Sequence, residues 1–123
     1  MISYRIDPAR RLVLVTFTGT PSAADISTHQ AELRRAPDFD PAYALLVDFS
    51  AASFANIQPA DVRMHVMQDP FDPAAPHAIV VRQESDSSMV RMFETYSELS
   101  ARTGPVQAFT DIPSALAWLD SLR

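Results

Sequence analysis

Five polar side chains in this sequence have the types and the spacing of an anion-binding crevice. Asp48 and Ser50 end one apolar run, and Arg82 follows a second one, "HAIVV". Ser87 and Ser88 open a long amphipathic pattern, where the free N–H groups of a helix N-terminus attract negative charge. Because ligands bind in α/β sheets outside the carboxyl ends of the strands, these residues predict a site for a phosphate or a carboxylate.

The same region also has a purely structural interpretation. Asp86 or Ser87 then caps the helix, and Arg82 pairs with Asp48 or Glu84. Other chemistry has little support, because the chain has no cysteine for thiol catalysis or zinc binding. Its two glycines are too few for a glycine-rich phosphate loop or a strained nucleophile turn. We therefore expect no enzymatic activity and no catalytic residue.

Methionine and phenylalanine concentrate in residues 54–71 and in the long amphipathic pattern. In the helical pattern 59–68, Val62 and Val66 share one face, whereas the methionines point partly elsewhere. Methionine fills irregular spaces and forms tolerant binding surfaces. The surplus therefore predicts an apolar ligand pocket, a dimer interface, or packing beneath the proline-rich segment 69–76. The candidate ligand-binding or interface residues are Phe54, Met64, Met67, Phe71, Met89 and Phe93.

The three histidines are candidates for metal binding by residue type only. His29 and His65 belong to different helical patterns and His77 begins an apolar run, so their spacing matches no metal signature. Closely spaced aspartates in "PDFDP" and "DPFDPAAP" lack the glycine and the number of oxygen ligands that a calcium loop needs. We expect no metal and no cofactor. We expect His65, beside Val66, to be half-buried and hydrogen-bonded.

Ten prolines divide the chain into short periodic segments that must position these residues. "ISYRI" and "LVLVTFTG" flank the turn "DPARR", which predicts a hairpin. "YALLVDF" and "HAIVV" have the near-continuous apolar character of strands covered on both faces, and "VQAF" is a further short strand. Helical spacing occurs between the strands and at the end of the chain, in residues 21–36, 59–68, 86–102 and 111–122.

The predicted order is β-β-α-β-α-β-α-β-α, which implies an α/β fold with a mixed, mostly parallel sheet and helical crossovers. Ser22 and Asp25 have the spacing of a capping box at the start of the first helix. Thr110 or Asp111 should cap the final helix. The side chains of that helix expected to face inward are Ile112, Leu116 and Leu119.

Composition narrows the class of protein. A chain of 123 residues suits a single domain, residues 1–123. The net charge of −5 argues against nucleic-acid binding, which needs clustered positive charge. No apolar run approaches the roughly 20 residues that span a bilayer, and "MISYRIDPARR" does not resemble a secretory signal. We expect a cytoplasmic protein without a membrane span.

The order of elements and three local motifs resemble the STAS superfamily, and within it the SpoIIAA-like group, also described as STAS/SEC14-like. The motifs are "VDFSAASF", "RMFETY" and "FTDIPSALAWL". The superfamily includes anti-sigma-factor antagonists and domains of sulfate transporters, and SpoIIAA-like members are mostly of unknown function. Because the motifs are hydrophobic, the resemblance implies the fold more than an activity.

The resemblance breaks at the regulatory serine of the antagonists, which a partner kinase phosphorylates at the start of the helix after "VDFS". Asn56, Ile57 and Gln58 stand where an aspartate and serines would be expected, and no serine lies between Ser53 and Ser85. The phosphorylation switch is missing. This weakens the interpretation as an antagonist, but a STAS-like surface could still dock a protein through the same loop and helix. We expect a regulatory module that binds a protein partner or forms a homodimer. The alternative, implied by the SEC14-like resemblance, is a carrier or sensor of a small apolar ligand.

Overall fold

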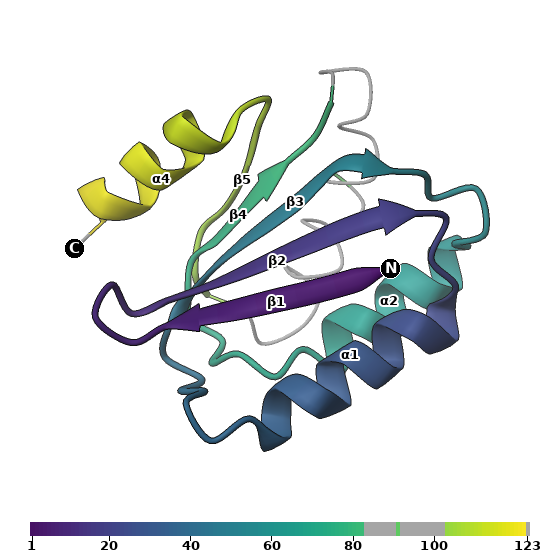
Figure 1. The fold of residues 1–123 in the computed structure, drawn as a ribbon, viewed down its shortest axis with the longest axis horizontal. Helices are drawn as coiled ribbons and strands as arrows, with labels where there is room; N and C mark the ends of the chain where they lie inside the picture. The colour runs from purple at the N-terminus through teal and green to yellow at the C-terminus, as the bar shows by residue number, and fades with distance from the viewer. Residues whose placement is uncertain (83–90, 92–102, 123) are drawn as a thin grey trace.

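The computed structural model describes residues 1–82, 91 and 103–122. In this part of the chain a five-stranded sheet has helices on both faces (Figure 1). β1 is antiparallel to β2, and the other neighbouring pairs are parallel. The predicted mixed, mostly parallel sheet is confirmed. Its strands lie in chain order: β1 (Ile2–Asp7), β2 (Leu12–Gly19), β3 (Ala44–Ala52), β4 (His77–Val80) and β5 (Val106–Phe109).

The helices α1 (Ala23–Arg35) and α2 (Pro59–Met67) lie side by side on one face of the sheet, and α4 (Ile112–Ser121) covers the other face (Figure 1). Right-handed crossovers between successive parallel strands place α1 and α2 on the same face. None of the helices in the described ranges has the length and apolar character to cross a bilayer. The predicted helix 86–102 lies almost entirely outside the described residues, together with Ser87, Ser88, Met89 and Phe93.

Local signals place the helix starts as expected. The Ser22 hydroxyl accepts from the Asp25 N–H at 3.1 Å, and the Asp25 carboxylate accepts from the Ser22 N–H at 2.9 Å. The two reciprocal bonds confirm the capping box. The Ser22 backbone N–H, and after it the Ser22 side chain, lower the pKa of Asp25 by hydrogen bonding to its carboxylate. At α4, the Asp111 carboxylate accepts from the Ser114 N–H at 2.7 Å, which selects Asp111 over Thr110 as the cap and lowers the pKa of Asp111.

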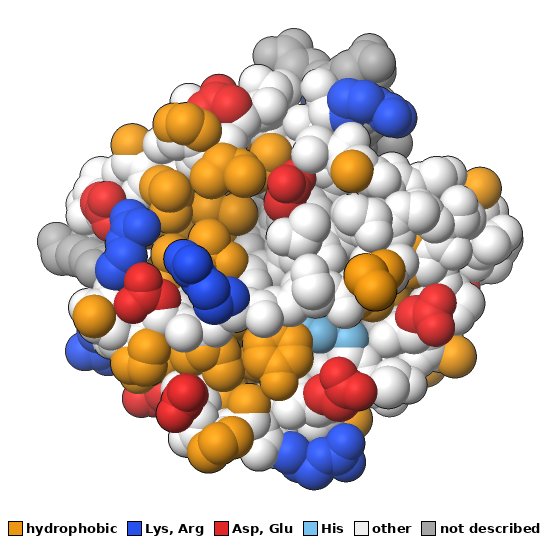
Figure 2. All heavy atoms as spheres, in the orientation of Figure 1, with side chains coloured by type: hydrophobic (Ala, Val, Ile, Leu, Met, Phe, Trp, Pro, Cys, Tyr) orange, Lys and Arg blue, Asp and Glu red, His pale blue; other side chains and the backbone are white. Residues whose placement is uncertain are grey.

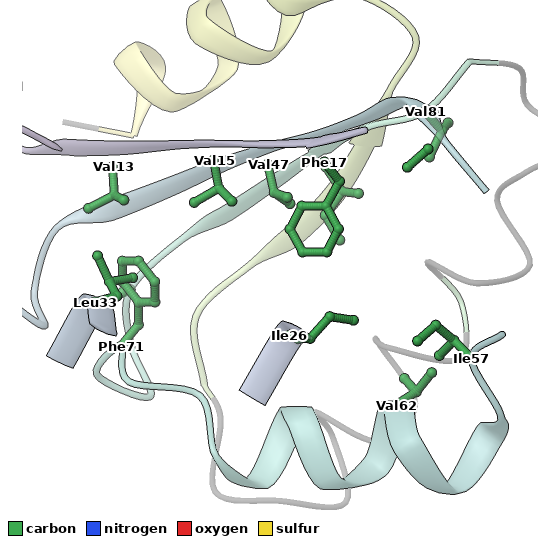
Figure 3. Packing of buried hydrophobic residues seen from close by; sticks show 13 residues of the cluster. Val13, Val15, Phe17, Ile26, Leu33, Val47, Ile57, Val62, Phe71 and Val81 are labelled. Atoms are coloured by element: carbon green, nitrogen blue, oxygen red, sulfur yellow. The ribbon is translucent and has the colours of Figure 1, made fainter. Parts of the chain in front are cut away.

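The larger core lies between the sheet and the α1–α2 layer (Figure 3). Alternate residues of the strands point into it, and each buried aliphatic or aromatic side chain there contributes about 1.5–3 kcal/mol relative to exposure. Ile26 and Leu33 supply the buried stripe of α1, and Val62 comes from α2. The sheet residues that face these helices include Val13, Val15, Phe17 and Val47.

A smaller core lies under α4. Leu46 and Val80 point to this face of the sheet and pack with Ala115 and Leu119. Leu119 is buried as predicted, but the prediction for Ile112 is wrong, because its side chain is 38% exposed. Ile112 is the first residue of α4, so the chain enters the helix before that face has closed onto the sheet.

Strand β3 is longer than its apolar run. The sequence places Ser50 in a loop, whereas β3 continues through Ser50 to Ala52. The extension follows from pairing with the end of β2, where Thr18 lies opposite Ala51 and Gly19 opposite Ala52, beyond an irregularity in the ladder after Thr16. Backbone pairing with a long neighbouring strand therefore outweighs the weak strand preference of small residues.

Candidate functional site

A cavity of about 130 Å³ lies between the sheet and the helices α1 and α2. Its described wall is mostly apolar, with Val15, Phe17 and Val47 pointing down from the sheet toward the helical layer and its flanking loop (Figure 3). Protein interiors contain few voids of this size. An engineered apolar cavity of about 150 Å³ is large enough to bind benzene. The residues that face these sheet side chains across the cavity are Ile26, Ile57 and Val62.

Aromatic rings packed edge to face form part of this wall. Phe49 contacts Phe17 with ring centroids 4.8 Å apart and Phe54 with centroids 4.7 Å apart. In another part of the wall, Phe71 contacts His77 with centroids 5.1 Å apart. Such pairs interact favourably beyond the area that they bury, so they hold the wall in a defined shape.

All three histidines of the chain line this one cavity. The sequence did not predict that they lie together, because they belong to separate elements. A signal was present in their spacing: His29 lies three residues after Ile26, on the buried stripe of α1, and His65 lies three after Val62. Even so, the described residues contain no group of three histidine, cysteine or acidic side chains close enough to hold a metal ion.

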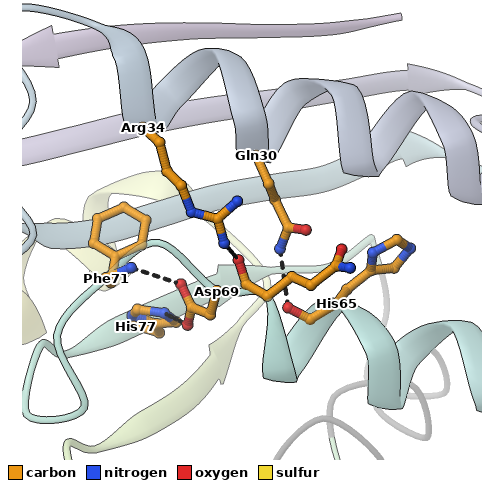
Figure 4. A network of polar contacts seen from close by, with 7 residues as sticks. Gln30, Arg34, His65, Asp69, Phe71 and His77 are labelled. Carbon is orange, nitrogen blue, oxygen red and sulfur yellow. Dashed lines mark hydrogen bonds and ion pairs between the residues drawn. The ribbon is translucent and has the colours of Figure 1, made fainter.

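The His77 ring is held by Asp69. Its Nε2 lies 2.9 Å from Asp69 Oδ2, and His77 is only 1% exposed. The other carboxylate oxygen of Asp69 accepts from the Phe71 N–H at 3.0 Å (Figure 4). These contacts tie the segment after α2 to the first residue of β4, and they bring Phe71 into the cavity wall.

His65 has a different environment. It is 7% exposed, and neither of its ring nitrogens has a hydrogen-bond partner among the described residues. The prediction that it is half-buried and hydrogen-bonded is therefore wrong for the ring. Burial lowers the pKa of His65, against the opposing charge of Asp61. Burial likewise lowers the pKa of His29, against Glu32, so both rings are neutral at pH 7.

Side chains of α1 reach across to the end of α2 (Figure 4). The Gln30 side-chain amide donates to the His65 carbonyl at 2.9 Å, and Arg34 donates to the Gln68 carbonyl. The last carbonyls of a helix have no partner within the helix, so α1 satisfies two carbonyls at this end of α2. The Gln30 side-chain oxygen is buried and has no hydrogen-bond partner in the described part of the chain.

The candidate ligand-binding or interface residues separate in space. Phe54 and Phe71 line the cavity. Met64 and Met67 lie on the exposed side of α2, with Met67 71% exposed, and they are not part of the cavity wall. The separation follows from helical geometry: α2 turns Val62, His65 and Val66 inward. Met89 and Phe93 lie outside the described residues.

The residues of the predicted anion crevice are only partly described. Asp48 Oδ1 accepts from the Ser50 N–H at 2.9 Å and from its hydroxyl at 2.6 Å. Arg82 is exposed beyond the end of β4, and these two described residues form no ion pair with each other. On the face of the molecule shown in Figure 2, acidic and basic side chains are interspersed. Ser87 and Ser88 lie outside the described residues, so the anion site stays a prediction.

The sheet order, the crossover helices and the C-terminal helix on the opposite face together define a SpoIIAA-like fold, as the resemblance predicts. A solved structure with this fold is similar over nearly the whole chain: an uncharacterised protein of the DUF3478 family from Shewanella loihica PV-4. The TM-score is 0.64 and the identity 18%, and the match covers 96% of this chain and 93% of that one. At that identity the similarity establishes the fold alone. No protein-family model matches the chain, and no curated protein matches it significantly.

Proposed function

We propose that this chain is a non-enzymatic binding protein that holds a small, largely apolar molecule between its sheet and the α1–α2 layer, as a carrier or a sensor. The observation that carries the proposal is the cavity of about 130 Å³ with its apolar wall. Ligand sites in proteins are usually preformed, mostly apolar hollows with a few polar groups that fix orientation, and this smaller hollow shares that lining.

Energetics favours an occupant. The apolar side chains that line the hollow lack dispersion partners on the side that faces it. An apolar molecule bound there supplies those partners and is itself removed from water.

The composition of the wall supports binding over catalysis. The described residues that line the cavity include no serine, threonine, cysteine or lysine that a neighbouring histidine would activate as a nucleophile. The buried histidine–aspartate pair, His77 with Asp69, ties the segment after α2 to β4, which is a structural role.

Native mass spectrometry of gently purified protein, compared with its denatured mass, tests the proposal. A non-covalent adduct that disappears on denaturation is the expected result, and its mass begins to identify the ligand. Val47→Phe should abolish the adduct, because Val47 points into the cavity. Val80→Phe is the matched control, because Val80 is buried on the α4 face, and this variant should keep the adduct.

Protein that carries no adduct and takes up no small apolar compound would contradict the proposal.

A second candidate function, a protein- or self-interaction module, is favoured by a different observation. Met67 and Met64 present apolar surface to solvent on α2, next to the segment where the antagonists carry their switch. Adaptable methionine surfaces suit protein contacts. The two functions are compatible, because the cavity and the methionines lie on opposite sides of α2.

A further inference from the structure

We propose that the molecule in this cavity carries a neutral hydroxyl group, which hydrogen-bonds to the imidazole of His65 and to the side-chain oxygen of Gln30. This inference rests on the proposed binding function and names the chemical class of the ligand: a compact alcohol or phenol with a body of about one six-membered ring.

His65 provides the first observation. It lines the cavity and is only 7% exposed. Both ring nitrogens lack a hydrogen-bond partner among the described residues. Buried polar side chains in folded proteins are nearly always bonded, so a group with two unmet nitrogens in a cavity wall calls for a polar atom from the occupant.

Gln30 provides the second observation. Its amide nitrogen must be the atom that faces the His65 carbonyl, because a carbonyl oxygen accepts hydrogen bonds and never donates them. The orientation of the amide is thereby set, and the oxygen is left as a buried acceptor without a partner in the described residues. The same hydrogen bond places the Gln30 amide beside the backbone of His65, and both residues line the cavity.

The donors and acceptors select the ligand group. Burial lowers the pKa of His65, so the ring is neutral and offers one N–H donor and one acceptor nitrogen. With the Gln30 oxygen, the site presents two acceptors and one donor. A carboxylate only accepts hydrogen bonds, so it meets the single donor and leaves both acceptors unmet. An ammonium group meets the acceptors alone. A hydroxyl accepts from the His65 N–H and donates to the Gln30 oxygen, so it uses the donor of the site as well as one of its acceptors.

The apolar remainder of the cavity sets the size of the ligand body. A volume of about 130 Å³ is close to that of an engineered cavity that holds benzene. The edge-to-face phenylalanine pairs at Phe49 match the packing preferred by another aromatic ring. A phenol is therefore a suitable probe, with toluene as the isosteric control without a hydroxyl and benzoate as the anionic control.

Isothermal titration calorimetry of the full chain at pH 7 with phenol, toluene and benzoate tests the inference. We expect phenol to bind roughly tenfold more tightly than toluene, which corresponds to about 1.4 kcal/mol, the scale of one neutral hydrogen bond. Benzoate should bind most weakly, because the cavity offers a charged carboxylate no cationic partner. In His65→Leu, toluene should still bind and the preference for phenol should disappear. In Gln30→Met the preference should fall partway.

Each other outcome has a distinct meaning. Equal affinity for phenol and toluene in the unaltered protein would overturn hydroxyl recognition, with a water bonding to His65 instead, and would leave the apolar binding function standing. Tightest binding of benzoate would overturn the neutral character of the ligand. Unchanged phenol preference in His65→Leu would remove His65 from the site. Failure of all three probes to bind would count against the cavity as a ligand site altogether.

Discussion

His65 is one of three buried histidines that line this cavity. His65 stands where α2 needs an inward-facing residue, yet neither ring nitrogen is satisfied by the described residues. Burial of an unmet polar group costs about 1–3 kcal/mol. Proteins break such rules of packing mainly at functional sites. An unmet polar side chain in a cavity wall therefore indicates a binding site.

Replacement of this histidine should stabilise the empty protein. We expect His65→Leu to raise the free energy of unfolding by about 1–3 kcal/mol, because an apolar side chain of similar volume removes the unmet nitrogens. Urea denaturation at pH 7, without ligand, measures the change. His29→Leu is the matched control and should gain less, because the His29 ring packs against Tyr4 and Phe17. A destabilised His65→Leu would show that the ring has a structural partner.

The same residues predict how stability depends on pH. Burial lowers the pKa of His29 and His65 below their ordinary value of 6.5, so the unfolded chain binds more protons than the folded one in the window below pH 6.5. Stability is therefore full above pH 6.5 and is lost as the pH falls toward the lowered pKa values.

Urea midpoints measured from about pH 7.5 to pH 5 should fall, and the fall should be smaller in His65→Leu. A midpoint that rises on acidification would contradict the neutral state of the two rings.

At the scale of elements, the helical layer and the loops around it keep the cavity in place. Gln30 and Arg34 attach α1 to the end of α2, and Asp69 attaches the segment after α2 to β4 through His77. The proline-rich segment is tied in as well. Its Pro73 carbonyl accepts from the Thr103 N–H at 2.9 Å and from the Gly104 N–H at 2.7 Å.

The contact at Gly104 leaves no space for a side chain. A Cβ there would stand 2.5 Å from the Ala74 carbonyl oxygen and 2.7 Å from that of Ala75, both backbone atoms that cannot move alone. We expect Gly104→Ala to lower the free energy of unfolding by about 1–3 kcal/mol, as overpacking does. Thr103→Ala, one residue earlier and exposed, keeps its backbone hydrogen bond and should change stability little. Equal effects of the two variants in urea denaturation would show that the segment shifts freely.

At the scale of the whole molecule, the exposed methionines bear on association. Met67 is 71% exposed, so we expect Met67→Asp to change the free energy of unfolding by no more than about 0.5 kcal/mol. If α2 forms an interface between copies of this chain, the same variant should be monomeric in analytical ultracentrifugation where the unaltered protein is dimeric. Ile112→Asp, on the opposite face of the sheet, is the control and should keep the dimer. A dimer that survives Met67→Asp would place the interface elsewhere.

The sequence by itself determined the elements, because their signals are local. Alternation and apolar runs located the strands, helical spacing located α1, α2 and α4, and the capping box at Ser22 has its partner three residues away. The order of these elements and the resemblance of three motifs to the SpoIIAA-like group then implied the SpoIIAA-like fold. The absence of the antagonists' phosphorylatable serine stays a prediction from the motif around "VDFS", because it depends on the resemblance to that family.

The tertiary structure alone decided which side chains meet. His29, His65 and His77 are separated by 36 and 12 positions in the sequence, and no periodicity predicts that they line one cavity. The continuation of β3 through Ser50 depends on pairing with β2, and the exposure of Ile112 depends on where α4 meets the sheet. Local patterns specify the face on which a residue lies, whereas a cavity arises from imperfect packing between faces, and that is a property of the assembled layers.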